Sequence, residues 1–450
     1  MMAFEKTLEN VSGWVWGWPM ILLLLGGGIF LTIKLGFFQF RYFPHMISQT
    51  LGKLFKKTNA DGSITPFQAT TAALASTIGA ANIVGVPVAI AFGGPGAVFW
   101  MWVVAMIGMA TKYAEVVLGV KYREKNAEGE WVGGPMHYIE KGLGWKPMAM
   151  FFAFFLMIEI GASSMVQSNS LSKNVEVAFN VPPVVTGLVI CFLVALMTIG
   201  GVKRVGAVTA KFIPFMVVLY LGAALIILFT NLTAIPQAFA LIFSSAFAPA
   251  PAAGGFIGAG VAMAIRWGLA RGLYSNEAGM GTASIAHAAA QTDHPAKQGL
   301  WGMFEVTIDT LVVCTMTALI VLTSGVWQNV PADEANTMVV VALAEVIGSS
   351  LAGTFITVCL FFFVLSTIGV IVFYGEKQAE YLFGPFIAKI IRISYLVAIV
   401  VGAIGGLQFI WQFLDIMLAL VVLPNIIALV LLSGEVKILT KDYIASLKVK

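Results

Sequence analysis

The chain has 450 residues, of which 59% are hydrophobic and only 11% are charged, and its mean hydropathy is +0.92. Soluble domains carry about 25% charged residues, so this composition excludes an ordinary soluble protein and indicates a protein immersed in lipid. The formal charge of +4 is spread over short connections, which is not the pattern of a nucleic-acid-binding protein. The three cysteines lie singly in apolar runs, so neither a disulfide framework nor a zinc site is predicted.

The N-terminal region carries one basic residue, Lys6, ahead of a long apolar run over residues 14–38. A secretory signal would end at a small-residue cleavage site, but none closes this run, and the run is long enough to span a bilayer. We therefore predict a retained first transmembrane helix. Trp14, Trp16 and Trp18 lie near its outer end, where an interfacial aromatic belt explains them.

Eleven apolar segments have the length of a membrane span. They cover about residues 14–38, 64–92, 96–120, 147–171, 183–200, 207–230, 256–290, 299–323, 351–374, 386–406 and 408–432. Backbone polar groups inside a bilayer have no water to bond, so these segments are expected to be helices. The sequence thus predicts an all-α polytopic membrane protein.

The basic residues are distributed asymmetrically between the two sides of the predicted bundle. All but five of the 26 lie in alternate connections or in the span ends beside them; the exceptions are Lys6 and Lys173 on the opposite side and Lys34, Arg266 and Arg271 within spans. Basic residues concentrate on the cytoplasmic side of cell membranes. We therefore expect a plasma- or inner-membrane protein with its N-terminus outside and its C-terminus in the cytoplasm.

Two connections on the predicted outer side, residues 231–255 and 324–350, are long, apolar and almost uncharged. They fit either simple connecting loops or short helices that lie over an extracellular vestibule as part of a gate, since long loops often serve as lids. The sequence leaves both interpretations open.

The second apolar segment, residues 64–92, is interrupted near its centre. Residues 76–87 contain two glycines, an asparagine, two hydroxyl side chains and Pro87, which removes a backbone donor and clashes with the preceding turn. Broken helices in membrane proteins are tolerated where they line a wet cavity, and their free N–H and carbonyl groups can hold a carboxylate or a cation. Tight helix packing through small residues is the alternative explanation for one such segment.

A second interruption lies in segment 256–290, where residues 272–281 include three glycines, Asn276 and Glu277. If the first span is set aside, the two interrupted segments each begin a group of five spans. Paired interruptions at corresponding positions are the sequence feature that best locates the binding site of a transporter. The two breaks together therefore favour a solute-binding role over simple packing.

Several motifs carry a resemblance to a known family. The run from Ser76 to Pro87 resembles the broken first core helix of LeuT-like sodium symporters. The runs 272–281 and 374–377, together with 133–136 and 165–169, are similar to signatures of the alanine or glycine:cation symporter family. The resemblance covers nearly the whole chain, and it implies sodium as the coupling ion, no other cofactor, and alanine or glycine as substrates.

The resemblance also implies a LeuT-like architecture, a five-plus-five inverted repeat preceded by one extra helix. On this basis residues 1–63 would hold the extra helix and a cytoplasmic connection, and residues 64–231 the first repeat. Residues 232–432 would form the second repeat with its extracellular loop helices, and residues 433–450 a cytoplasmic tail. The expected partners are a small neutral amino acid, sodium and the lipid bilayer, with no nucleic acid.

A zwitterionic substrate needs donors for its carboxylate and acceptors for its ammonium group. We assign the carboxylate to backbone N–H groups of the first break, with help from one polar side chain, and the ammonium to carbonyl groups of the second. The predicted substrate residues are Thr77, Ile78, Gly79, Ala80 and Asn82 in the first break, Leu273, Tyr274, Ser275 and Asn276 in the second, and Gln167 and Asn169 on the fourth span. Interhelical hydrogen bonding is the alternative role for Gln167 and Asn169.

By similarity to LeuT-like carriers, a sodium ion would bind between the ninth span and the first break. The ligands would be the hydroxyl groups of Ser366 and Thr367 and the carbonyl oxygens of Phe363, Ala75 and Ile78. Hydroxyl groups in apolar helices also bond back to their own helix, which is the alternative for both side chains. Whether Asn82 and Thr77 form a second ion site is left open.

Charged residues within membrane spans usually mark pathways or ion pairs. The predicted spans include Glu115, Glu159, Arg266, Arg271, Glu277, Glu305, Asp309 and Asp415. We expect one of the arginines to pair with Glu277, and Glu305 and Asp309 to share one polar network because they lie four residues apart. His287 is expected to pack within its helix. A proton-coupled carrier that uses one of the acids is the alternative to sodium coupling.

Two other functional classes fit the sequence less well. Channel filters are rings of repeated elements, usually in oligomers, whereas this chain carries two unlike breaks. Hydrolytic and nucleotide-binding motifs such as H-E-x-x-H, G-x-S-x-G and G-x-x-x-x-G-K-[ST] do not occur in the sequence, so no enzymatic activity is predicted.

Overall fold

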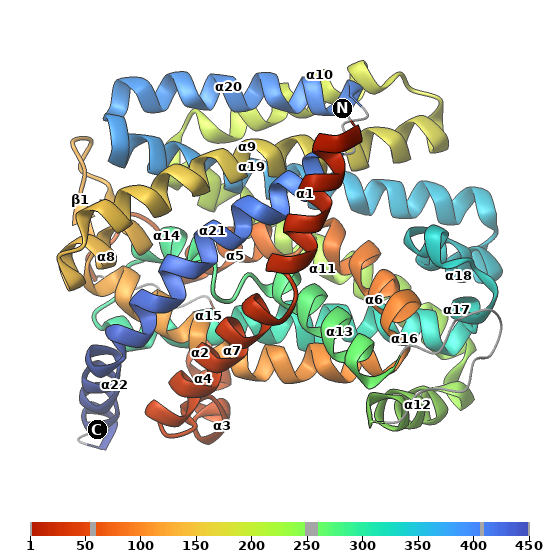
Figure 1. The fold of residues 1–450 in the computed structure, drawn as a ribbon, viewed down its shortest axis with the longest axis horizontal. Helices are drawn as coiled ribbons and strands as arrows, with labels where there is room; N and C mark the ends of the chain where they lie inside the picture. The colour runs from red at the N-terminus through yellow and green to blue at the C-terminus, as the bar shows by residue number, and fades with distance from the viewer. Residues whose placement is uncertain (1, 55–59, 248–259, 406–408, 449–450) are drawn as a thin grey trace.

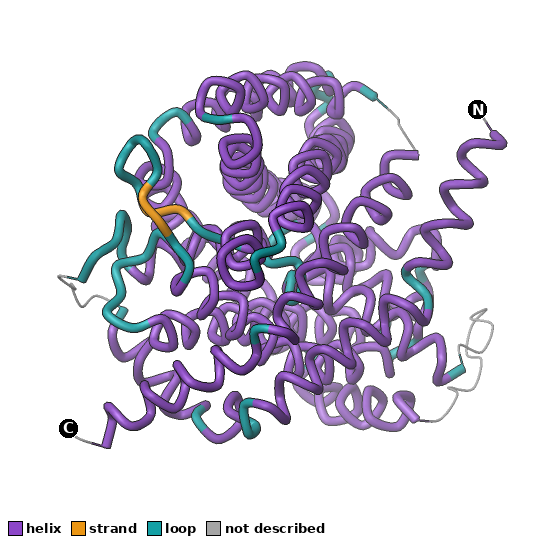
Figure 2. Tube along the Cα trace, turned by 60° about the vertical axis from the view of Figure 1, so that its left-hand side comes forward, coloured by secondary structure: helices purple, strands orange, loops and turns teal. Residues whose placement is uncertain are grey.

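The computed structural model describes residues 2–54, 60–247, 260–405 and 409–448, and helices dominate this part of the chain (Figure 1). The named strands within it form one short antiparallel hairpin, β1 (Glu124–Lys125) and β2 (Trp131–Val132), which stands at the edge of the bundle in Figure 2. The predicted all-α membrane architecture is confirmed.

The first half of the chain forms the following elements. They are α1 (Met2–Val15), α2 (Trp18–Lys34), α3 (Phe38–Arg41), α4 (Phe43–Thr50), η1 (Leu51–Lys53), α5 (Pro66–Thr77), η2 (Ala81–Gly85), α6 (Val86–Gly93), α7 (Gly96–Lys121), α8 (Pro135–Leu143), α9 (Lys146–Phe179), α10 (Pro183–Thr198) and α11 (Gly201–Thr230). Among them η1 is a 3-10 turn and η2 is a π-helical segment.

The second half continues with the following elements. They are η3 (Leu232–Ala234), α12 (Ile235–Phe247), α13 (Val261–Asn276), α14 (Thr282–Ala288), α15 (Pro295–Val306), η4 (Thr307–Cys314), α16 (Thr315–Ser324), α17 (Val326–Asn329), η5 (Ala332–Thr337), α18 (Met338–Ile347), α19 (Ser349–Phe383), α20 (Pro385–Ile404), α21 (Phe409–Leu431) and α22 (Ser433–Lys448). The segment η4 is π-helical and joins α15 to α16.

All eleven predicted spans coincide with helices. Within the described residues, eight helices are long and apolar enough to cross a membrane, and the bent pair formed by α5 with η2 and α6 makes a ninth. The other two predicted spans are α10, with 16 residues, and the interrupted pair α13 and α14, with 16 and 7 residues. Length and composition therefore support a multi-pass protein, and the number of eleven crossings stays a prediction.

The two long connections on the predicted outer side contain short helices instead of open loops. The first connection holds η3 and α12, and its residues from 248 onward lie outside the described part of the chain. The second connection holds α17, η5 and α18. In Figure 1 these helices gather at one end of the molecule, opposite the end that carries α8, β1 and α22. Their participation in a gate stays a prediction.

The tryptophans of the N-terminal region separate into two environments. Trp14 and Trp18 are 71% and 65% exposed, as an interfacial belt requires. Trp16 instead turns inward, and its indole N–H donates to the main-chain oxygen of Asp415 on α21 at 2.8 Å. The belt explanation therefore holds for two of the three, while the third attaches α1 to the bundle.

Helix α7 lies inside the bundle, and α13 approaches it closely along a face with two glycines. A Cβ atom on Gly268 would lie 2.4 Å from the carbonyl oxygen of Ala97, and one on Gly272 would lie 2.5 Å from Cγ1 of Val104. Both distances are shorter than any real Cβ contact, so glycine sets the separation of the two helices, as small residues do in membrane bundles. This contact positions the second broken segment.

We expect Gly268→Ala to destabilise the protein, because the added methyl group meets rigid backbone at Ala97. Overpacking of this kind costs about 1–3 kcal/mol. The matched control is Gly222→Ala in α11, where an added Cβ meets nothing within 4 Å. Thermal unfolding of the purified proteins in detergent measures both. Equal melting temperatures for the two variants would contradict the role assigned to Gly268.

Candidate functional site

The first interrupted segment begins with a well-defined helix cap and ends in extended backbone. The hydroxyl of Thr65 accepts from the backbone N–H of Gln68, and the Gln68 side chain accepts from the N–H of Thr65, which completes a capping box before α5. The helix stops at Thr77, and Ile78 has extended dihedral angles. The chain resumes as η2 and α6 at an angle of 49° to α5. The predicted break is therefore present.

Asn82 holds this break in place. Its Oδ1 accepts from the backbone N–H of Gly79 at 2.9 Å, while its Nδ2 donates to Oδ1 of Asp309 at 2.7 Å and to Oγ of Ser275 at 3.1 Å. Ser275 also donates to Asp309, at 2.7 Å. These side chains are almost fully buried. The first break, the end of α13 and η4 thus share one hydrogen-bond network.

The second interrupted segment separates α13 from α14. Glu277 adopts left-handed backbone dihedrals with φ of 53°, and Gly279 and Gly281 follow with φ of 107° and 80°. One carboxylate oxygen of Glu115, on α7, accepts from the N–H groups of both glycines at 2.9 and 3.0 Å. The same oxygen accepts from Nδ2 of Asn425 at 2.8 Å. Glu115 therefore satisfies the backbone groups that the missing helical turn leaves free.

The expected ion pair between Glu277 and one of the arginines is wrong. The Glu277 carboxylate accepts hydrogen bonds from the hydroxyl groups of Ser76, at 3.2 Å, and Thr282, at 2.6 Å. Arg271 lies over the ring of Trp267, and the distance from the guanidinium carbon to the ring centroid is 5.2 Å. The arginines lie on earlier turns of α13 and line a pocket with Ser12 and Asp415, so Glu277 connects the two breaks through hydroxyl groups instead.

The predicted network between Glu305 and Asp309 is also wrong. Glu305 pairs with Lys112 at 3.2 Å and lies 3.4 Å from His287, whereas Asp309 bonds to Asn82 and Ser275. The two acids lie on either side of the start of the π-helical segment η4, whose wider turn alters the helical phase. His287 is fully buried in α14, as predicted, with its ring nitrogen Nδ1 2.7 Å from the side-chain nitrogen of Gln298.

A small cavity, here called the central cavity, lies between the two breaks and helices α9, α19 and α21. It leaves about 30 Å³ for the centres of water molecules, which is room for about two waters. Its wall consists of Ser76, Thr77, Gly79, Ala81, Glu159, Ile160, Ser163, Gln167, Tyr274, Glu277, Met280, Thr282, Thr367, Ile371, Tyr374 and Leu418.

Only part of the predicted substrate set faces this cavity. Thr77, Gly79, Gln167 and Tyr274 line it. The remaining predicted substrate residues do not line it. They are Ile78, Ala80, Asn82, Asn169, Leu273, Ser275 and Asn276. Ala80 lines a second, larger cavity instead.

Gln167 and Asn169 have different roles although they are two residues apart on α9. Oε1 of Gln167 is buried and has no hydrogen-bond partner in the described part of the chain, so it is free for a solute. Nδ2 of Asn169 donates to the carbonyl oxygens of Gly402 and Gly405 at 3.0 and 2.7 Å. Asn169 therefore makes the interhelical contact with α20 that the sequence offered as its alternative role.

Oxygen atoms from α5 and α19 converge at the predicted sodium position. The hydroxyl of Thr367 donates to the carbonyl oxygens of Ala75, at 2.8 Å, and Phe363, at 2.9 Å. Ser366 bonds back to its own helix, with its hydroxyl 2.9 Å from the carbonyl oxygen of Phe362 and 3.0 Å from that of Phe363. Thr367 lines the central cavity, whereas the other four predicted ligands lie behind its wall.

Several residues that line the central cavity are not among the residues predicted to bind substrate or sodium. Glu159 and Ser163 lie eight and four residues before Gln167 on α9, and this spacing places all three on one helical face. A count of polar residues at intervals of four along α9 would have found them. Glu277 and Tyr374 belong to the motifs 272–281 and 374–377, which do not show where a side chain points. The direction of Glu277 depends on the break after α13, and that of Tyr374 on the rotation of the continuous helix α19.

A larger cavity, here called the outer cavity because it lies beside η5 of the second predicted outer connection, leaves about 350 Å³ for the centres of water molecules. Ala81, Gln167 and Tyr274 line both this outer cavity and the central one. Asn336 of η5 and Arg271 contribute to its wall. The side chains of Gln167 and Tyr274 therefore form part of the partition between the two spaces.

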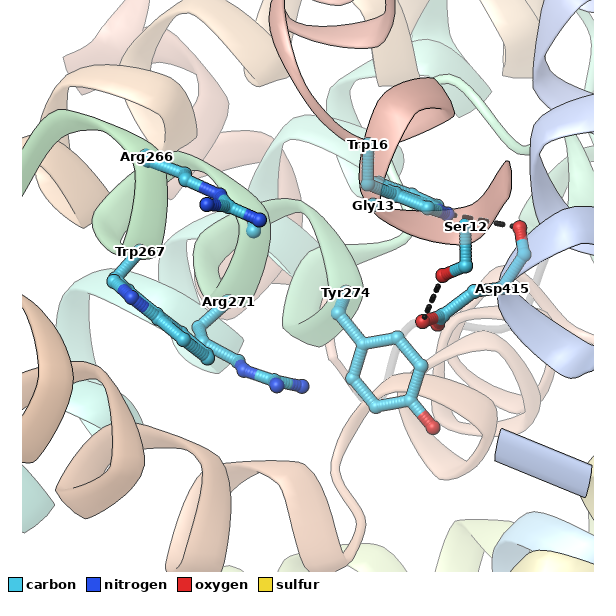
Figure 3. Close-up of a pocket in the computed structure, with 9 residues that line it drawn as sticks. Ser12, Gly13, Trp16, Arg266, Trp267, Arg271, Tyr274 and Asp415 are labelled. Atoms are coloured by element: carbon cyan, nitrogen blue, oxygen red, sulfur yellow. Dashed lines mark hydrogen bonds between the residues drawn. The ribbon is translucent and has the colours of Figure 1, made fainter. Parts of the chain in front are cut away.

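A third pocket, with about 130 Å³ for the centres of water molecules, lies between α1, α13 and α21 (Figure 3). Arg271 and Tyr274 extend into it from α13, and Asp415 reaches it from α21. The hydroxyl of Ser12, on α1, donates to Oδ2 of Asp415 at 3.0 Å. The N-terminal helix therefore forms one wall of this pocket and fixes the carboxylate at its edge.

The comparison with known proteins decides the family. The whole chain, residues 1–450, matches the sodium:alanine symporter family. The chain belongs to this family. The assignment makes the protein a membrane transporter of the sodium and amino-acid symporter class and not an enzyme, in agreement with the resemblance that the motifs carry.

Two relatives match over almost their full length. The uncharacterized transporter YflA of Bacillus subtilis is 52% identical over 439 residues, which cover 98% of this chain and 93% of that protein. The sodium/alanine symporter AgcS of Methanococcus maripaludis is 42% identical over 447 residues, which cover 98% of each chain.

The solved structures include one with a clearly similar fold. The crystal structure of MhsT in complex with L-phenylalanine matches with a TM-score of 0.62 over 83% of this chain and 89% of that one, at 13% sequence identity. Identity this low supports the fold alone, and the fold is the predicted LeuT-like one. The boundaries of the two repeats within the chain stay a prediction.

We expect Glu115→Ala to destabilise the second break, because three N–H donors lose their acceptor in a place that water does not reach. Unsatisfied buried donors cost about 1–3 kcal/mol each, so we expect a loss of about 3 kcal/mol or more in the free energy of unfolding. Thermal unfolding in detergent measures it. The control is Glu176→Ala, at the exposed end of α9. A Glu115→Ala protein as stable as this control would contradict the assignment.

Proposed function

We propose that the protein imports small neutral amino acids, with alanine and glycine as its substrates, and that an inward sodium gradient drives the transport. One observation carries the proposal: a small cavity lies between two broken helices, and the Thr367 hydroxyl in its wall bonds to the Ala75 carbonyl of the first broken helix. Unwound backbone of this kind binds both solute and ion in transporters with inverted repeats. The names of the family and of AgcS agree with this choice of solutes.

The size of the central cavity supports a small substrate. Its apolar wall comes from Ile160, Met280, Ile371 and Leu418, and the free volume accommodates little beyond a methyl-sized side chain after modest opening. One methylene group changes binding by only about 1–3 kcal/mol, so exclusion of larger amino acids rests mainly on steric contact with this wall.

In this proposal the substrate carboxylate binds to the first break. The amide groups of Ile78 and Gly79 have partners in the structure, the carbonyl oxygen of Leu74 at 2.7 Å and Oδ1 of Asn82 at 2.9 Å. The substrate carboxylate would replace the Asn82 side chain at Gly79, while Thr77 and the amide of Ala80 complete the donor set. Asn82 would then keep its bonds to Asp309 and Ser275.

The ammonium group is assigned to the end of α13. The last carbonyl groups of a helix lack intrahelical partners and carry partial negative charge, which suits a cation. These are the carbonyls of residues 273–276, of which that of Leu273 accepts from the N–H of Glu277 at 2.9 Å. Gln167 offers its free side-chain oxygen from the opposite wall.

The sodium ion is assigned to the oxygen atoms of Ala75, Phe363 and Thr367, with Ser366 and the carbonyl of Ile78 as further ligands. Neutral oxygen ligands allow the ion to leave again, as transport requires. Release of both solutes follows when the helices that carry the two breaks rock against the rest of the bundle. In this scheme the N-terminus lies outside the cell and the C-terminus in the cytoplasm.

A proton-driven carrier is the second candidate, and one observation favours it. The wall of the central cavity contains two carboxyl groups, those of Glu159 and Glu277. Acids inside membrane proteins often serve as proton relays.

The decisive measurement is uptake of labelled alanine by liposomes that contain the purified protein. With an inward sodium gradient we expect uptake several-fold above that with potassium, and we expect glycine but not leucine to compete. Equal uptake in sodium and potassium would contradict sodium coupling. Uptake driven by an inward proton gradient in the absence of sodium would select the second candidate.

A substitution at the ion site tests the assignment of Thr367. Thr367→Ala should raise the sodium concentration for half-maximal uptake by about tenfold or more, because a lost oxygen ligand costs on the order of 1–3 kcal/mol. Selectivity among amino acids should stay unchanged. The control is Thr357→Ala, which changes a buried threonine of the same helix that does not line the cavity. Altered selectivity with unchanged sodium dependence would move Thr367 to the substrate site.

A further inference from the structure

Glu159 is a buried acid that neither the break network nor the proposed ion site uses. It lies on α9 with only 5% of its surface exposed, and it lines the central cavity. Within the described residues its carboxyl group has no hydrogen bond and no ion pair. A carboxylate in such surroundings loses its hydration without compensation, which strongly disfavours the charged form.

The groups around Glu159 do not supply a positive charge. Glu277 and Tyr274 face the same cavity from the second broken segment, and Tyr374 faces it from α19. Tyr395 approaches from α20, where its hydroxyl donates to a carbonyl of α9 at 2.7 Å. The wall of the cavity includes no lysine or arginine among the described residues. Glu159 therefore shares the cavity with a second acid and two phenols, while Tyr395 lies outside the cavity wall.

The two acids of the cavity are not equivalent. Glu277 receives hydrogen bonds from Ser76 and Thr282, which stabilise its charged form. Lys112, a fully buried base on α7, is paired with Glu305 at 3.2 Å. When two carboxyl groups share a dry site, the one without donors retains the proton. That group is Glu159.

A second observation points to a ligand in this cavity. Oε1 of Gln167 lies two helical turns beyond Glu159 on the same face of α9, is buried, and has no partner in the described part of the chain. An unsatisfied acceptor and an unpaired acid on one wall both favour a positively charged occupant. Thr367, from the proposed sodium site, lines the same cavity.

We propose that Glu159 holds a proton while the cavity is empty and releases it to solvent when sodium binds, so that protons and sodium compete for the carrier. The identity of the cation rests on the proposed function. The exchange balances, since one sodium ion enters as one proton leaves and the neutral carboxylic acid becomes a carboxylate. The new charge faces an ion that is otherwise held by uncharged oxygens. Opposite charges about 10 Å apart in a protein interior interact strongly enough to change affinity by roughly tenfold.

The first test uses the unmodified protein. Sodium chloride is added to purified carrier in lightly buffered detergent with a pH-indicator dye, and choline chloride serves as the control salt. We expect sodium to release up to one proton per protein and choline to release none. In the same protein the sodium concentration for half-maximal binding should rise as the pH falls, by about tenfold in total over the pH range in which Glu159 takes up its proton. Sodium binding without proton release would overturn the proposal.

The second test uses Glu159→Gln, which keeps the shape of the side chain and removes its proton exchange. We expect no proton release, weaker sodium binding by roughly tenfold, and a sodium affinity that no longer changes with pH. Glu176→Gln, at the exposed end of the same helix, should behave like the unmodified protein. A purely structural role for Glu159 would lower stability but leave the pH dependence in place, and retention of that dependence in Glu159→Gln overturns the proposal.

The two proposals fail separately. Proton release by sodium together with no uptake of labelled alanine would overturn the proposed substrate and support the exchange. Sodium-driven alanine uptake without proton release would support the proposed function and overturn the exchange. If Glu159→Gln does not fold, the measurement on the unmodified protein still decides.

Discussion

Main chain that leaves the helical conformation inside a membrane protein has to find hydrogen-bond partners within the protein. The two breaks of this transporter meet that requirement with buried polar side chains from neighbouring helices. Glu115 accepts from two amides of the second break, and Asn82 accepts from Gly79 in the first. Without these side chains the breaks would revert to helix or expose unpaired groups, and no central cavity would exist. Much of the buried polarity of the chain therefore follows from two short irregular segments.

The same side chains also connect the two breaks to each other. Ser76 of the first segment donates to Glu277 of the second, and Asn82 donates to Ser275. Because these bonds are buried, relative movement of the breaks would leave several groups unpaired at once. The broken segments thus form one polar unit, which fits a mechanism in which they move together against α9, α19 and α20. The solute cavity lies at the border of that unit.

The sequence predicts the scaffold well, because the scaffold depends on features that one chain displays directly. Apolar length predicts the helices, and the clustered glycines with Pro87 and Asn276 predict both breaks. The convergence of Thr367 with Ala75 could be anticipated only through family resemblance, because no local pattern relates two residues nearly 300 positions apart. The number of membrane crossings stays a prediction, since α10 and the α13–α14 pair are short.

The partners of buried charges could not be predicted from spacing, since they depend on the rotation of each helix about its axis. Glu305 and Asp309 are four residues apart, yet the π-helical turn between α15 and α16 sends them to different neighbours. Asn169 points to α20, whereas Gln167, two residues away, faces the cavity.

The distribution of charge differs between the third pocket and the central cavity, which meet at Tyr274. The walls of the third pocket carry Arg266 and Arg271, and the acid there, Asp415, accepts a hydrogen bond from Ser12 of the N-terminal helix. The charged side chains in the wall of the central cavity are acids alone. In the proposed transport scheme the positive potential of the third pocket would attract the carboxylate of an arriving zwitterion, while the acids of the central cavity would favour cations. Solute and ion would then be drawn to different parts of one path, and the cavity would lack a complete set of charges until both are present.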